Sequence, residues 1–192
     1  MQPATEMTLT EYLALDPGRD GRIEWLNERA YAMSGARPLH NVVTLNVAMA
    51  LGTRLRGQPC RATSSDQRVH IEATGAYVYP DVVVVCPPWS TAKQDPMSVT
   101  NPVLLVEVLS PSTRDYDLGG KLSHYRRIPS LQDILYVDPD AQTLVQYTRD
   151  GERWVLQDIT SGSVELAQLG LALPLAELFA DLEDLPDDAR KD

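Results

Sequence analysis

The fold is decided by one stretch of the sequence, Val103-Leu104-Leu105-Val106-Glu107-Val108-Leu109, in which a single carboxylate interrupts an apolar run. A continuous run of β-branched residues and leucines of this length predicts a strand that is buried on both faces. Two further apolar runs, residues 82–85 and 134–137, predict strands of the same kind. We therefore expect these three strands at the centre of a sheet.

Two helices are predicted beside these strands. Residues 38–56 carry apolar side chains near helical spacing, begin with Pro38 and are followed by Gly57, so they form the longest predicted helix. A second helix is predicted at about residues 118–127. The order of elements from about residue 38 to 138 then reads helix, strand, strand, strand, helix, strand.

Shorter elements decorate this core. Thr8 and Glu11 form a capping-box pattern, which predicts a short helix that ends at Pro17-Gly18. Residues 22–33 predict a β-hairpin, and residues 143–166 predict a β-meander. Residues 78–85 are predicted to form one continuous strand piece, and residues 87–102 a loop.

Length and charge limit the class of protein. A chain of 192 residues fits one domain, which we place at residues 1–180, followed by an acidic tail at 181–192. The net charge of −10 argues against a generic basic coat for nucleic acid. The sequence has no apolar run near the ~18–20 residues of a membrane span and no secretory signal pattern at its start, so a cytoplasmic protein without a membrane partner is expected.

The two cysteines, Cys60 and Cys86, show no metal-binding spacing. We therefore expect neither a disulfide framework nor a structural zinc site. Cys86 ends an apolar run, so it is interpreted as a small buried hydrophobic residue.

Two carboxylates stand where hydrophobic patterning would not place them. Asp81 follows Pro80 at the start of the valine run, and Glu107 interrupts the central run. A buried carboxylate needs a cation, a proton or a strong donor as its partner. On adjacent strands the two could share a divalent cation, and an all-oxygen ligand set suits Mg²⁺ or Mn²⁺. The simpler alternative is that Asp81 caps a turn and Glu107 points to water.

A lysine lies on the following helix. Asp117, Lys121 and Tyr125 are spaced four residues apart and share one helix face. They could form part of the same site, or Asp117 and Lys121 could form an ordinary helical ion pair.

These motifs carry a resemblance to a known family. Tyr79-Pro80-Asp81 followed by Glu107-Val108-Leu109, together with the predicted order of helices and strands, resembles the PD-(D/E)XK nuclease superfamily with its αβββαβ core. The run from Glu107 to Thr113, then Asp117, Lys121 and Tyr125, is similar to the Uma-type restriction endonuclease family. The resemblance covers about residues 8–180. Leu109 departs from the superfamily pattern, which commonly has lysine there, and in the Uma-type family Lys121 stands in for it.

The resemblance implies a fold class, α/β (α+β), with a mixed sheet flanked by helices and with an added N-terminal hairpin and C-terminal meander. It also implies a metal-dependent endonuclease that hydrolyses DNA. Asp81, Glu107 and the Val108 carbonyl would bind Mg²⁺ or Mn²⁺, and Lys121 would orient or deprotonate the attacking water or stabilise charge. Glu24 would join the site or be an exposed strand residue, and a homodimer is a further expectation.

Alternatives remain open. The chain could be a nuclease-like module that binds nucleic acid or protein with little or no cleavage, or a hydrolase of small phosphoesters. His40, near the start of the long helix, is interpreted as a surface or capping residue, with a contact to phosphate or to a neighbouring group as the alternative.

Overall fold

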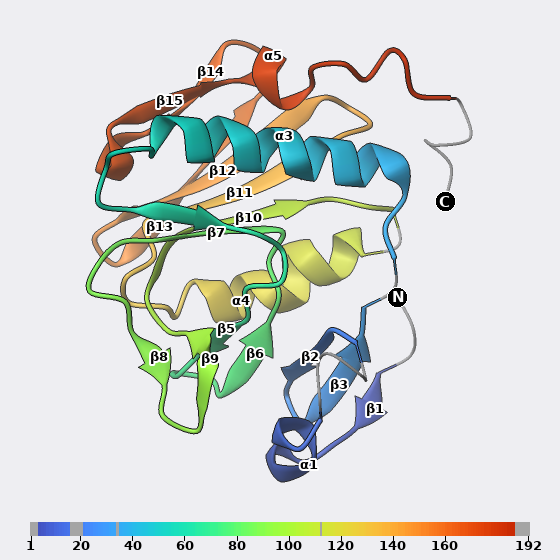
Figure 1. Cartoon of the computed structure of the whole chain (residues 1–192), viewed down its shortest axis with the longest axis vertical. Coiled ribbons are helices and arrows are strands. Elements are labelled where there is room, and N and C mark those ends of the chain that lie inside the picture. The colour runs from blue at the N-terminus through green and yellow to red at the C-terminus, as the bar shows by residue number, and fades with distance from the viewer. Residues whose placement is uncertain (1–3, 16–20, 34, 112, 187–192) are drawn as a thin grey trace.

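The computed structural model describes residues 4–15, 21–33, 35–111 and 113–186 (Figure 1). Within them, a six-stranded sheet has the order β13-β12-β11-β10-β7-β4. From one edge to the other its strands are β13 (Arg153–Ile159), β12 (Thr143–Asp150), β11 (Asp133–Asp138), β10 (Pro102–Val108), β7 (Val82–Val85) and β4 (Arg61–Thr63).

The centre of this sheet agrees with the apolar runs of the sequence. β10 pairs in parallel with β11 and antiparallel with β7, and every residue of β7 and β11 is buried. A parallel pair needs a crossover connection. Here the crossover contains η1 (Tyr116–Lys121), a π-helical segment, and α4 (Leu122–Tyr125). Together with α3 (Pro38–Arg54), these elements form the predicted mixed sheet flanked by helices.

Alternating side chains of the central strands bury the two faces separately. On one face, Val82, Val84 and Leu104 pack with α3 and with α5 (Leu175–Leu178). On the other face, Val83 and Leu105 pack with α4 and with strands of the second sheet. Figure 1 shows α3 and α4 on opposite sides of the sheet. This period of two is what a strand buried on both faces requires.

The second sheet has the order β1-β3-β2-β6-β5-β9-β8. Its strands are β1 (Thr5–Glu6), β2 (Ile23–Leu26), β3 (Arg29–Ala32), β5 (Val69–Ile71), β6 (Ala76–Val78), β8 (Thr91–Ala92) and β9 (Asp95–Val99). The predicted hairpin is β2–β3, and the predicted capping box at Thr8 begins α1 (Leu9–Leu13). Pro17-Gly18, the predicted stop of that helix, lies outside the described residues.

Two expectations for this region are wrong. Residues 87–102 are not a plain loop, because β8 and β9 lie there. Residues 78–85 do not form one strand, because Tyr79, Pro80 and Asp81 separate β6 in one sheet from β7 in the other. Since proline cannot donate to a strand ladder, Pro80 is a natural point for the chain to change sheets.

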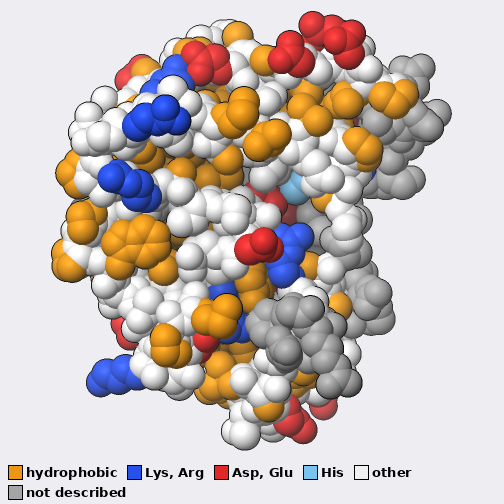
Figure 2. Space-filling model, viewed as in Figure 1, with side chains coloured by type: hydrophobic (Ala, Val, Ile, Leu, Met, Phe, Trp, Pro, Cys, Tyr) orange, Lys and Arg blue, Asp and Glu red, His pale blue; other side chains and the backbone are white. Residues whose placement is uncertain are grey.

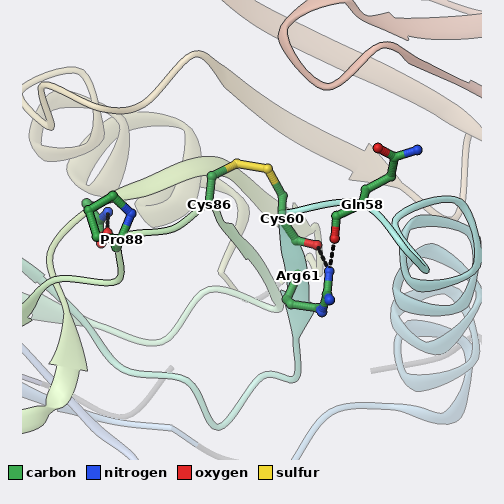
Figure 3. Close-up of a disulfide and its surroundings, with 6 residues drawn as sticks. Gln58, Cys60, Arg61, Cys86 and Pro88 are labelled. Carbon is green, nitrogen blue, oxygen red and sulfur yellow. Dashed lines mark hydrogen bonds between the residues drawn. A yellow bond between two sulfur atoms is a disulfide. The ribbon is translucent and has the colours of Figure 1, made fainter.

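The interpretation of the cysteines is also wrong. Cys60 and Cys86 form a disulfide with a Cα–Cα distance of 4.0 Å (Figure 3). Arg61 of β4 is paired with Val85 of β7, so the two cysteines are the next cross-strand neighbours. Cys86 is half-buried and covalently bonded, and is not a free core residue. Spacing along the chain carried no sign of this bond, because strand register creates it.

The predicted meander at residues 143–166 is only partly correct. β12 pairs with β13 as expected, but β14 (Ser163–Leu166) pairs with β15 (Leu171–Pro174) in a separate two-stranded sheet. η2 (Ala167–Leu169) connects β14 to β15, and α5 follows. Residues 187–192 of the predicted acidic tail lie outside the described residues. Among the helices that the structure describes, none is both long and apolar enough to cross a membrane.

Candidate active site

A pocket of about 110 Å³ lies where the two sheets meet the start of α3. It is lined by residues of β2, β3, α3, β10 and η1 and by the segments that connect them, including Asp81 directly before β7. Its lining includes Glu24, His40, Asp81, Glu107, Val108, Asp117 and Lys121. Figure 2 shows acidic, basic and histidine side chains gathered around a hollow below α3. The five residues predicted from the sequence to form the site therefore lie at one pocket: Glu24, Asp81, Glu107, Val108 and Lys121.

Lys121 is the centre of the buried charge in this pocket. Its Nζ lies 2.9 Å from Oε1 of Glu24, 3.1 Å from Oε1 of Glu107 and 3.3 Å from Oδ1 of Asp117. The residue is 2% exposed. Burial alone would lower the pKa of Lys121, but the charges of Glu107 and Glu24 outweigh it, so its pKa is well above the ordinary value. The ammonium form is therefore strongly held.

Glu24, on β2 of the second sheet, contacts Lys121. Its Oε1 also accepts a hydrogen bond of 2.8 Å from the backbone N–H of Tyr79, and its Oε2 accepts one of 3.0 Å from the hydroxyl of Tyr116. Both carboxylate oxygens are thus bound by protein donors. Burial raises the pKa of Glu24, while Lys121 opposes that rise.

Glu107 lies on the other side of Lys121. Its Oε1 also accepts a hydrogen bond from the hydroxyl of Tyr125, which is fully buried. Burial raises the pKa of Glu107 well above its usual range; Lys121 opposes this rise and the nearby Asp117 adds to it. The carboxyl group that interrupts the central apolar run is buried, with a lysine and a tyrosine as partners, and does not point to water.

Asp81 and His40 form a second pair at the pocket. Oδ2 of Asp81 accepts a hydrogen bond of 2.8 Å from the backbone N–H of Val108 and lies 3.3 Å from Nε2 of His40. Burial lowers the pKa of His40, but its hydrogen bonds to Asp81 and to the backbone of Val108, with the charge of Asp81, produce a net rise. The interpretation of His40 as a surface or capping residue is wrong, because its ring bridges α3 to the central sheet.

Sequence reasoning missed the tyrosines that complete the site. Tyr116 bonds Glu24, and the hydroxyl of Tyr136 donates to the backbone carbonyl of Asp117 at 3.0 Å. A Cβ atom on Gly120 would lie 3.3 Å from the Tyr116 ring, so glycine leaves that ring room inside the π-helical segment. Segments of π-helix are frequent at functional sites. The four-residue spacing of Lys121 and Tyr125 was the only signal for this cluster in the sequence.

The charge of the pocket suits a bound cation. Glu24, Asp81, Glu107 and Asp117 supply four carboxylates, against the ammonium of Lys121 and the imidazole of His40. The raised pKa of Glu107, caused first by burial, also reflects the neighbouring acids Asp117, Asp81 and Glu24. Among the described residues, no three His, Cys, Asp or Glu side chains already stand in ligand geometry. The donor set therefore suits a divalent cation in chemistry and charge, while the described side chains do not form a preorganised metal site.

Comparison with known proteins identifies the relatives of the chain. The profile of the family Uma2, described as "Putative restriction endonuclease", matches residues 9–180. The chain belongs to the Uma2 family. Two uncharacterized proteins of Synechocystis sp. are similar to it. The protein slr1290 is 32% identical to this chain, and the match covers 94% of this chain and 95% of slr1290. The protein sll1609 is 30% identical, and its match covers 83% of this chain and 91% of sll1609.

A solved structure shares the Uma2 fold. It is described as a putative nuclease belonging to DUF820 from Anabaena variabilis, and it superposes with a TM-score of 0.72 at 18% sequence identity. The match covers 90% of this chain and 97% of the other. The match confirms the restriction-endonuclease-like fold that was predicted from the order of helices and strands in the sequence.

Proposed function

We propose that this Uma2 protein is a metal-dependent endonuclease that hydrolyses DNA phosphodiester bonds. The observation that carries the proposal is the pocket that Asp81, Glu107 and Lys121 line together, from the connection before β7, from β10 and from η1. Membership of a family described as restriction endonucleases supports the same chemistry.

Asp81, Glu107 and the Val108 carbonyl would hold the cation. When bound, a divalent cation supplies Lewis-acid activation of a phosphoryl oxygen and lowers the pKa of water. Glu24 lies 2.9 Å from Nζ of Lys121 through Oε1, and each of its oxygens accepts a hydrogen bond from the protein. We assign Glu24 to holding Lys121 in place.

Lys121 acts in this proposal as a cation and not as a base. Its pKa is raised by the charges of Glu107 and Glu24, so it does not readily give up a proton. An ammonium has three N–H donors, and Glu24, Glu107 and Asp117 stand at its three contacts. If Glu107 turned toward a cation, one donor of Lys121 would become available to a phosphoryl oxygen and would stabilise the charge of the transition state.

Basic side chains at the pocket suit a phosphate-rich substrate. Arg22 and Arg37 both line the pocket, and Arg37 also pairs with Asp140. Their guanidinium groups offer contacts to phosphate at the pocket, although the whole chain carries a net charge of −10. The expected homodimer stays a prediction, which light scattering after size-exclusion chromatography can test.

The test is cleavage of supercoiled plasmid and single-stranded DNA with Mg²⁺, Mn²⁺ or EDTA. Cleavage should need a divalent cation and fall by at least about 100-fold in Glu107→Gln and in Asp81→Asn. Glu72→Gln, at an exposed position outside the pocket, is the matched control and should cut like the parent. Cation-independent cleavage, or equal cleavage by all variants, would contradict the proposal. Metal binding without cleavage would favour a nuclease-like binding module.

A further inference from the structure

We propose that His40 supplies a nitrogen ligand to the cation of this pocket, so that the pocket binds Mn²⁺ in preference to Mg²⁺. This inference rests on the cation site of the proposed function. It adds a ligand that the sequence analysis did not select, and it predicts which cation the pocket takes.

The first argument is the direction of the ring. Nε2 of His40 lies 3.3 Å from Oδ2 of Asp81, and the ring also hydrogen-bonds the backbone of Val108. Asp81 and the Val108 carbonyl are two of the three proposed oxygen ligands. In an octahedral shell with bonds of about 2.1 Å, adjacent ligand atoms lie about 3.0 Å apart. The Nε2–Oδ2 separation is thus close to the edge of such a shell, and a few tenths of an ångström complete it.

The second argument is the support behind the ring. Nδ1 of His40 lies 3.4 Å from Oγ1 of Thr44, one helical turn along α3, and the Asn41 side chain also contacts the ring. Histidine ligands typically bond a partner through the other ring nitrogen, which fixes the tautomer and the orientation. The neighbouring core residues Leu39 and Val43 anchor the same turn. The ring is therefore held with Nε2 facing the pocket.

The third argument is access. The side chains of His40 and Asp81 are 13% and 14% exposed, whereas those of Lys121 and Glu107 are 3% and 4% exposed. A cation entering the pocket meets His40 and Asp81 before it reaches the buried cluster. Imidazole suits transition metals, and Mg²⁺ favours oxygen ligands and keeps its waters. One nitrogen among the oxygens therefore shifts the preference toward Mn²⁺.

The test is electron spin-echo envelope modulation on the tag-free full chain loaded with Mn²⁺. A directly bound imidazole couples its ¹⁴N nucleus to the metal, and this coupling is expected in the parent protein. The sequence contains three histidines, so the double variant His70→Gln/His124→Gln retains only His40 and should keep the coupling. His40→Gln should lose it, and its Mn²⁺ affinity measured by calorimetry should fall about tenfold, with a smaller change for Mg²⁺.

Each outcome decides the point. Mn²⁺ bound without ¹⁴N coupling, coupling that survives in His40→Gln, no Mn²⁺ binding, or Mg²⁺ binding as tight as Mn²⁺ binding would each overturn the inference. If His40→Gln does not fold, the double variant still tests the assignment on its own. Coupling through His40 in a protein that does not cut DNA would leave this inference standing while the proposed nuclease function fails.

Discussion

The ammonium of Lys121 lies 2.9 Å from Oε1 of Glu24, and this contact joins the second sheet to the crossover between β10 and β11 of the six-stranded sheet. Glu24 lies on β2, in the hairpin that the sequence presents as a decoration of the core. The hairpin is therefore part of the candidate site. A truncation that removes it would leave Lys121 with one carboxylate fewer.

Replacing Lys121 by methionine should lower the free energy of unfolding by about 3–5 kcal/mol, because Glu24, Glu107 and Asp117 would lose their shared cation in a buried place. Urea unfolding followed by circular dichroism measures this. Lys93→Met is the matched control, since Lys93 is exposed, and should change stability by no more than about 0.5 kcal/mol. A Lys121→Met protein as stable as the parent would contradict a stabilising role of the shared ammonium.

A second buried ion pair is expected to stabilise the second sheet. Arg68 lies 2.7 Å from Asp95 and donates to Ser98, and the ring of Tyr12 lies 5.8 Å from its guanidinium. Arg68→Met should cost about 3–5 kcal/mol because Asp95 would remain as an unpaired buried charge. The double variant Arg68→Met/Asp95→Asn should recover part of that loss, and a double-mutant cycle in urea measures the coupling. If the losses of stability in the two single variants simply added up in the double variant, Arg68 and Asp95 would not stabilise the fold as a pair.

Reduction of the disulfide should destabilise the fold. Cys60 and Cys86 are 26 residues apart in sequence, and a closed loop of that size corresponds to about 3.5 kcal/mol in the chain-entropy account. Urea unfolding with and without a phosphine reductant should show this difference in the parent protein. The Cys60→Ser/Cys86→Ser variant should be insensitive to the reductant. Two free thiols in the oxidised parent, counted by mass spectrometry after alkylation, would contradict the bond.

Asp133 should make stability depend on pH. Burial raises the pKa of this carboxyl group, and the hydrogen bonds from Thr148 and Gln146 only partly oppose the rise. A raised pKa for an acid means that the folded state holds the proton more tightly than the unfolded state. The contribution to stability is therefore full below the unfolded pKa of about 3.9 and is lost as pH rises through the folded pKa.

Asp133→Asn keeps an oxygen acceptor for Thr148 and Gln146 and removes the titration. Relative to this variant, the parent should lose stability between about pH 4 and pH 8. Urea midpoints at both pH values measure the difference. A parent that gains stability relative to the variant over this range would have the opposite sign and would contradict the burial argument.

Much of the fold follows from local sequence. The continuous apolar composition of β7, β10 and β11 predicts that these strands are buried, and a proline in the first turn of α3 marks where that helix begins. The acids Asp81 and Glu107 could be selected because they interrupt or border those runs. Lys121 could be connected with them only through a resemblance to a family, since its own spacing is that of an ordinary helical pair.

Two strands, the disulfide and the role of His40 could not be predicted from local sequence. β8 and β9 are short, and the sequence around them is rich in proline and polar residues, so no apolar periodicity marks them. The disulfide depends on the register of β4 against β7. The role of His40 depends on where its ring points once α3 is packed on the sheet.

The sequence by itself therefore determined the central strands, the flanking helices and the choice of Asp81 and Glu107 as site residues. Strand burial and helical periodicity follow from the pattern of apolar and polar side chains among residues that are close in the sequence. Only the tertiary structure decided that Glu24 shares Lys121 with Glu107, that Cys60 meets Cys86 and that His40 faces Asp81. Those pairs come from elements far apart in the chain. Their distances are set by strand register and helix packing, which no local pattern encodes.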